Sequence, residues 1–229
     1  MLFYTLEDLV DDVERFDSMG IGITVHANAD GAVRQFLDAI DQVIQKNGVL
    51  KARHQVGHAI TIHPEDLSRF NAYNVTAEFS PFFWFPSAYS EAFGPRLGEN
   101  RMAHLFPMKS LSRSSGRFVL ASDAPLFWQG PFPAIESAIT RKSPHNESNE
   151  VLSPLEKIDL ETVIEAYTIN GAYLMNQEKI TGSLEVGKKA DFIVLNQNLF
   201  EIEPEEISDT QVLSTYFNGM KVFEKSPGQ

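Results

Sequence analysis

The sequence predicts an α/β protein with a parallel sheet, and two observations lead to this fold class. Short apolar, β-branched segments alternate with segments whose apolar residues recur at the helical period. Polar residues also follow directly on several of the strand segments. Four such units make half of a (β/α)8 TIM-type barrel, whose chemistry lies at the carboxyl ends of the strands. An open doubly wound sheet fits the alternation too, although the chain offers no glycine-rich phosphate loop.

The individual elements are predicted from their periodicity and their flanking residues. The predicted strands cover residues 20–26, 53–62, 74–80 and 117–123. The predicted helices cover residues 6–19, 32–45 and 159–175, and a further helix begins at Pro64. Asp30 and Asp159 are the expected N-caps of two of these helices.

The last part of the chain follows a different pattern. Residues 182–195 suggest a turn that leads into a buried strand, and Asn218-Gly219 between two apolar segments predicts a β-hairpin. This tail indicates a small β annex and not another βα unit. We therefore expect one domain over residues 1–178, with the barrel units and the helices that follow them, and the annex over residues 179–229.

Composition excludes several classes of function. The 229 residues carry a net charge of −12, which argues against a nucleic acid or an anionic membrane as partner. No apolar segment approaches the roughly 18 residues of a membrane span. The absence of cysteine excludes disulfides, thiolate metal sites and cysteine nucleophiles. The first residues lack a signal-peptide pattern, so the expected location is the cytoplasm unless a leader precedes them.

Three polar residues stand where chemistry is expected in a parallel barrel. His26 closes the first predicted strand, His58 lies near the end of the second, and Asp123 closes the fourth. At the carboxyl ends of parallel strands all three would point into one mouth. Two imidazoles and a carboxylate suit a zinc-type hydrolytic site, because imidazole binds the metal and the carboxylate can take a proton from water. Taken alone, each residue could instead be a polar residue of the core whose hydrogen bonds are all made within the protein.

The other polar and aromatic candidates carry weaker signals. Arg53 and His54 are candidates for a substrate contact or for supporting the metal ligands. Trp84 belongs to an aromatic segment after a strand end, where it would line a pocket for an apolar substrate group or pack against a neighbouring loop. The remaining histidines are expected at the surface: His63, His104 and His145.

Several segments resemble motifs of the amidohydrolase superfamily. Residues 182–195, Gly-Ser-Leu-Glu-Val-Gly-Lys-Lys-Ala-Asp-Phe-Ile-Val-Leu, are similar to its C-terminal motif, and residues 163–172 to the helix before it. Residues 25–33 resemble the fifth-strand motif of the type 3 branch, and residues 53–59 and 121–125 resemble its sixth- and eighth-strand motifs. The resemblance extends over nearly the whole chain, in order.

The resemblance implies a (β/α)8 metal-dependent hydrolase acting on carbon–nitrogen bonds of small amide, N-acyl or cyclic amide substrates. By position, His26 and His58 would be metal ligands, and Asp123 would touch the metal and serve as general base and acid. The implied cofactor is a divalent metal, with zinc as the default and one or two ions. The chain departs from the motifs at Asn28, Ala29 and Gly57, which could loosen the support of the ligands.

The largest departure is a missing motif. The family opens with a His-x-His metal pair, and this sequence contains none. The resemblance therefore implies the C-terminal half of the barrel, strands five to eight, with part of a β-sandwich annex, and a chain that is inactive alone. The alternative is a non-catalytic regulatory or binding protein, because some relatives are known as exoenzyme regulators.

A half barrel also predicts self-association. The strands that carry His26 and Asp123 would be open sheet edges, and apolar side chains such as Phe79, Phe83 and Trp84 would be left bare. We therefore expect a homo-oligomer.

Overall fold

The computed structural model describes residues 3–80, 84–123, 130–144 and 149–226. The chain divides into two compact units, which are described separately below. The first unit is Met1–Ser80 with Gly94–Ala121, and the second is Pro81–Phe93 with Ser122–Gln229. The division at residue 178 expected from the sequence stays a prediction.

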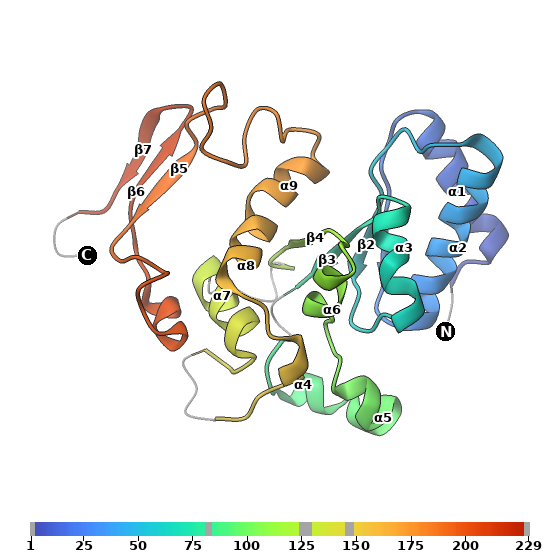
Figure 1. The fold of residues 1–229 in the computed structure, drawn as a ribbon, viewed down its shortest axis with the longest axis horizontal. Coiled ribbons are helices and arrows are strands. Elements are labelled where there is room, and N and C mark those ends of the chain that lie inside the picture. The colour runs from blue at the N-terminus through green and yellow to red at the C-terminus, as the bar shows by residue number, and fades with distance from the viewer. Residues whose placement is uncertain (1–2, 81–83, 124–129, 145–148, 227–229) are drawn as a thin grey trace. The chain divides into compact units, whose positions relative to one another are not determined.

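The first unit is built on a four-stranded parallel sheet with the order β1-β2-β3-β4. Strands β2, β3 and β4 are labelled in Figure 1. Its strands are β1 (Thr24–Ala27), β2 (Gln55–His58), β3 (Thr76–Phe79) and β4 (Phe118–Leu120). Its helices are α1 (Leu6–Ser18), α2 (Asp30–Asn47), η1 (Pro64–Asp66), α3 (Leu67–Ala72), α5 (Gly94–Met102) and α6 (Met108–Arg113). The strand order never reverses, as expected for consecutive βα units, and β1 and β4 are the two edges. The α/β class and the parallel sheet are confirmed.

The helices of this unit begin and end for local reasons. Thr5 and Asp8 form a capping box that starts α1. Helix α2 presents an apolar stripe that is fully buried, which includes Val33, Phe36 and Ile40. Asp30 was expected to cap α2, but the N-cap is Ala29. Asp30 is instead the first helical residue, and its N–H donates to Thr61 Oγ1 (3.0 Å).

The strands are shorter than the apolar pattern predicts. The segment expected to run from 53 to 62 pairs only from Gln55 to His58. It leaves the sheet there because His58 (φ 69°) and Ala59 (φ 42°) both adopt left-handed backbone conformations, which do not continue a strand. Hydrophobicity predicts burial, and Ile60 and Ile62 are buried in the loop without being paired in the sheet.

The second unit contains the remaining helices and a separate small sheet. Its elements are α4 (Ala88–Glu91), α7 (Pro131–Thr140), η3 (Pro154–Glu156), α8 (Leu160–Tyr167), α9 (Ile169–Leu174), η4 (Pro204–Asp209) and strands β5 (Phe192–Leu195), β6 (Val212–Phe217) and β7 (Met220–Glu224). Asp159 caps α8 as expected and accepts from Thr162 N–H (2.8 Å). The single helix expected over 159–175 is broken at Thr168, whose backbone (φ −121°, ψ −90°) is not helical.

Strands β5, β6 and β7 form an antiparallel sheet with the order β5-β6-β7, in agreement with the expected β annex (Figure 1). Asn218 (φ 50°) and Gly219 (φ 77°) both have positive φ at the turn between β6 and β7, as the hairpin prediction requires. The sandwich partner of this sheet stays a prediction.

Two of the aromatic side chains expected to be bare are covered. Phe79 and Trp84 are both fully buried, so the prediction of an exposed aromatic surface is wrong for them. Phe79 packs its ring against that of Phe118 on the neighbouring strand, with centroids 5.6 Å apart. Phe82 and Phe83 lie outside the described residues. Within the described part of the chain, no helix combines the length and the apolar character that crossing a bilayer demands.

Candidate functional site

The two histidines predicted as metal ligands lie next to each other in the first unit. Their ring centroids are 4.4 Å apart, with an angle of 63° between the ring planes. The sheet register pairs His26 with Gly57 and Ala27 with His58. Because successive side chains of a strand point to opposite faces, regular geometry would send the two imidazoles to opposite sides of the sheet. A local departure from strand geometry must therefore bring them together.

That departure is a tight turn centred on His58. Ala59 N–H donates to Gly57 C=O (3.0 Å) across His58, whose φ is 69°. This is the γ-turn with positive φ, a rare and strained conformation. A left-handed conformation of a non-glycine residue costs about 1–3 kcal/mol, and such strain is concentrated at functional sites. The backbone thus holds His58 in an unfavourable conformation that places its ring beside His26.

A buried hydroxyl supports the position of the His58 ring. Ser80, the residue after β3, is almost fully buried, and its Oγ lies 3.4 Å from His58 Nδ1. A contact at Nδ1 makes Nε2 the nitrogen best placed to bind a metal. Ser80 was not predicted as a site residue. Its place at a strand end one strand from His58 could have indicated it.

Asp123 belongs to the second unit, three residues beyond the end of β4. It is partly exposed, and its backbone is left-handed (φ 51°). Its role in the site with His26 and His58 stays a prediction. Among the described residues, no group of three or more His, Cys, Asp or Glu side chains could hold a metal ion.

His54 lies at the other end of the same strand and has a different environment. Its ring is fully buried, with Nδ1 accepting from Ile23 N–H (3.3 Å) and Nε2 lying 3.3 Å from Asp17 Oδ1. Asp17, on α1, also accepts from the backbone N–H groups of Lys51 and Ala52 (2.8 and 2.9 Å). Burial lowers the pKa of His54, and the Asp17 hydrogen bond only partly opposes this. These contacts connect α1 to the amino end of the sheet.

The other predicted contact residues are Arg53 and Trp84, and the structure gives each a different environment. Arg53 precedes β2, and its carbonyl oxygen lies so close to Gly22 that a Cβ there would be 2.1 Å away. Trp84 is fully buried in the second unit, where Nε1 has no hydrogen-bond partner among the described residues. His104 is exposed, as expected, and His63 is partly exposed. His145 lies outside the described residues.

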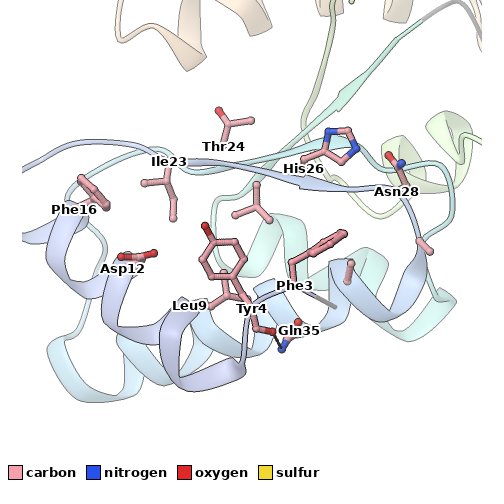
Figure 2. A pocket seen from close by; sticks show the side chains of 13 residues that line it. Phe3, Tyr4, Leu9, Asp12, Phe16, Ile23, Thr24, His26, Asn28 and Gln35 are labelled. Atoms are coloured by element: carbon pink, nitrogen blue, oxygen red, sulfur yellow. Dashed lines mark hydrogen bonds between the residues drawn. The ribbon is translucent and has the colours of Figure 1, made fainter. Parts of the chain in front are cut away.

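His26 also lines an open pocket of about 800 Å³ along the free edge of β1 (Figure 2). Thr24 and His26 come from the strand, while Tyr4, Leu9 and Phe16 come from α1 and the residues before it. Most of the lining is apolar. The edge strand that carries one of the predicted ligands is therefore accessible from its unpaired side.

Comparison with known proteins agrees with the motifs. A family model described as "Amidohydrolase family" matches residues 4–223. The chain is 31% identical over 211 residues to a Bacillus subtilis protein named "Putative amidohydrolase YtcJ", covering 90% of this chain and 38% of that protein. It is 26% identical to the N-substituted formamide deformylase of Arthrobacter pascens, covering 98% of this chain and 40% of that protein. The chain thus spans about two fifths of these relatives.

Solved structures show the same fold. A metal-dependent hydrolase from Pyrococcus horikoshii superposes with a TM-score of 0.73 at 22% identity, covering 89% of this chain and 40% of that one. An adenosine deaminase from Xanthomonas campestris with bound zinc superposes with a TM-score of 0.62 at 14% identity, covering 95% of this chain and 48% of that one. At these identities the likeness establishes the fold alone.

Proposed function

The chain belongs to the amidohydrolase family, and from this premise we propose that the whole protein hydrolyses a carbon–nitrogen bond other than a peptide bond. The substrate is a small molecule of the amide, N-acyl or cyclic amide class. The observation that carries the proposal is the pair of imidazoles at the carboxyl ends of β1 and β2, whose ring centroids lie 4.4 Å apart. The strained turn at His58 brings the two rings together. A relative named as a formamide deformylase supports the same bond class.

The chemistry of the donors fits a divalent metal. Two neighbouring imidazoles are suitable ligands for zinc, which is the metal we propose, as one or two ions. His26 and His58 would hold it, with Ser80 orienting the His58 ring. A bound divalent ion lowers the pKa of water toward neutrality and polarises a carbonyl oxygen. Any further ligand would have to come from elsewhere, because no third His, Cys, Asp or Glu side chain lies with this pair among the described residues.

Asp123 is the proposed general base and acid, and its carboxylate would also contact the metal. Its carboxylate would take a proton from the attacking water while the oxygen of that water bonds to the carbonyl carbon. The same proton would then pass from Asp123 to the leaving nitrogen as the carbon–nitrogen bond breaks. The charge of the carboxylate is thereby restored at the end of the cycle.

Arg53, His54 and Trp84 remain proposed contributors, as substrate contacts or as supports of the ligands. For His54 the contacts with Asp17 and Ile23 favour a supporting role through the sheet. For Trp84, the buried indole N–H has no hydrogen-bond partner within the described residues, which would suit a polar atom of a substrate or supporting group.

A non-catalytic binding or regulatory protein on the same scaffold is the second candidate. The observation that favours it is that only two of the potential ligands are assembled within the described residues. Two imidazoles are too few for a closed site, so we expect the 229-residue chain alone to be inactive. The cytoplasm is the proposed location.

Zinc titration of the 229-residue chain by calorimetry tests the metal assignment. His26→Ala and His58→Ala should each weaken zinc binding at least about tenfold. The control is His63→Asn, which removes an imidazole but keeps an acceptor for Glu65 N–H, the group that His63 Nδ1 now accepts from (3.3 Å). Equal affinity in all three variants would contradict the assignment. Hydrolysis of N-acyl and formamide substrates by the whole protein then separates the enzyme from the binding protein.

We also propose a homo-oligomer formed through the edge of β1. Ile23 C=O accepts from Gln55 N–H (2.9 Å), and backbone groups of a strand alternate in direction, so those of Thr24 and His26 point toward the unpaired side. The backbone N–H and C=O groups of such an edge, beside an apolar pocket, can pair with the same edge of a second copy of the chain. Sedimentation velocity at micromolar concentration should detect a dimer or larger species. A compact monomer would contradict this proposal.

A further inference from the structure

A second cavity in the first unit, of about 460 Å³, lies just beyond the histidine pair along the chain. Asp30 and Thr61 line it, and they follow His26 and His58 by only four and three residues. Its apolar floor includes Ile62 and Pro107, both buried. Each of the strands β1 and β2 thus carries a predicted ligand near its carboxyl end, and residues a few positions further along the chain line this cavity.

The walls of the cavity are fixed to one another by hydrogen bonds. Thr61 links the first two loops, because its Oγ1 accepts from Asp30 N–H (3.0 Å) and its own N–H donates to Asn28 C=O (3.1 Å). The segment between α5 and α6 is tied to the loop after β2 by Phe106 N–H, which donates to Ile60 C=O (2.8 Å). A cavity held in this way needs little ordering when a ligand binds.

Among the side chains that line this cavity, Arg101 and His63 offer donors suited to an anion. Arg101, from α5, has a half-exposed guanidinium whose Nη2 lies 3.0 Å from Asp30 Oδ2. A guanidinium has five N–H donors, and Asp30 engages it at one nitrogen. His63 Nδ1 lies 3.3 Å from Glu65 N and 3.6 Å from Glu65 Oε2, and in the tautomer that accepts the backbone N–H, Nε2 carries the proton and is a donor.

We propose that this cavity binds the carboxylate group of a small organic acid. Arg101 is the charged partner, His63 Nε2–H is a second donor, and the apolar floor receives the hydrocarbon part of the acid. Asp30 opposes binding, because its own carboxylate competes for Arg101. The proposal deepens the hydrolase function and rests on it for one point, namely that the acid is part of the substrate, which would then be an amide bearing a carboxylate.

The test is a binding measurement that needs neither metal nor turnover. The 229-residue chain, treated with EDTA, is titrated by calorimetry with N-acetylglycine and with its uncharged analogue N-acetylglycinamide. The acid should bind and the amide should not. Arg101→Gln should weaken binding of the acid at least about tenfold, since a charge-assisted contact is lost. Asp30→Asn should strengthen it, because the competing charge is removed and the side-chain shape is kept.

Arg96→Gln is the matched control, since Arg96 is an exposed arginine of α5 that does not line the cavity. Unchanged affinity in Arg101→Gln, weaker binding in Asp30→Asn, or equal binding of the acid and the amide would overturn the proposal. The double variant of His26→Ala and His58→Ala should still bind N-acetylglycine. If that variant loses zinc binding and still binds the acid, the zinc site and the carboxylate site are independent. The failure of one proposal can then be told apart from the failure of the other.

Discussion

One histidine precedes strand β2 and another ends it, and the two differ in burial, backbone conformation and contacts. His58, at the carboxyl end, is partly exposed, strained at φ 69° and in contact with a second imidazole. His54, just before the amino end, is fully buried, bonded at both ring nitrogens and shielded from solvent. One residue type therefore serves two purposes within five positions. The carboxyl ends of parallel strands open toward ligands, whereas the amino ends secure the helices to the sheet.

The comparison extends to the two glycines beside these histidines. Gly22, at the amino end, faces Arg53 C=O so closely that an added Cβ would be 2.1 Å from it. Gly57, beside His58, would place a Cβ no closer than 3.6 Å to any neighbour, which is ordinary contact. Backbone atoms therefore leave no space for a side chain at the amino end, whereas a methyl group fits at the carboxyl end. Chemistry and stability are thus separated along one strand.

The largest expected effect is on turnover. Asp123→Asn should lower the turnover of the whole protein by about 10²-fold or more, because an amide cannot accept the proton of the attacking water. Zinc content, measured by elemental analysis, should remain close to that of the wild type. Near-normal turnover would remove Asp123 from the mechanism and would weaken the assignment of chemistry to the carboxyl ends.

The two glycines test the separation directly. Gly22→Ala should destabilise the chain by about 1–3 kcal/mol, because the methyl group would collide with a backbone oxygen that cannot move freely. Gly57→Ala should leave the stability unchanged or raise it by up to about 1 kcal/mol, because the residue loses less conformational entropy on folding. Urea unfolding of both variants measures the difference. Equal destabilisation would contradict the contrast between the two ends.

Ser80→Ala should weaken zinc binding about tenfold, because the His58 ring loses the hydroxyl that lies 3.4 Å from Nδ1. The free energy of unfolding should change by less than about 1 kcal/mol. Ser114→Ala is the control, since Ser114 Oγ donates to Ser110 C=O in the same unit. A larger effect on unfolding than on zinc affinity would make Ser80 a packing residue.

The smallest expected effect concerns pH. Burial lowers the pKa of His54 in the folded chain, so the unfolded chain binds a proton at a higher pH than the folded one. The contribution of this residue to stability is therefore complete above the unfolded pKa of about 6.5 and is lost as the pH falls toward the folded pKa. Urea unfolding at several pH values should show a steeper loss in the wild type than in His54→Gln. Identical pH profiles would contradict the buried, neutral state of His54.

Much of this architecture can be predicted from the sequence. The alternation of strand and helix patterns gives the parallel sheet, and Asn218-Gly219 gives the hairpin, because both signals depend on local geometry. The helix break at Thr168 and the burial of Phe79 and Trp84 are not predictable in this way. The burial of Phe79, for example, involves Phe118, a residue distant in the sequence that no local pattern contains.

The sequence by itself determined the family, the two histidines at strand ends and the expectation that they act together. Only the tertiary structure decided how they meet, since their register would separate them and the left-handed turn at His58 brings them to 4.4 Å. It also decided that His54 is enclosed between Asp17 and Ile23 while His58 is not. The physical reason is that residue type and spacing fix what a side chain can do. The backbone path and the neighbours across the sheet fix which of those possibilities is realised.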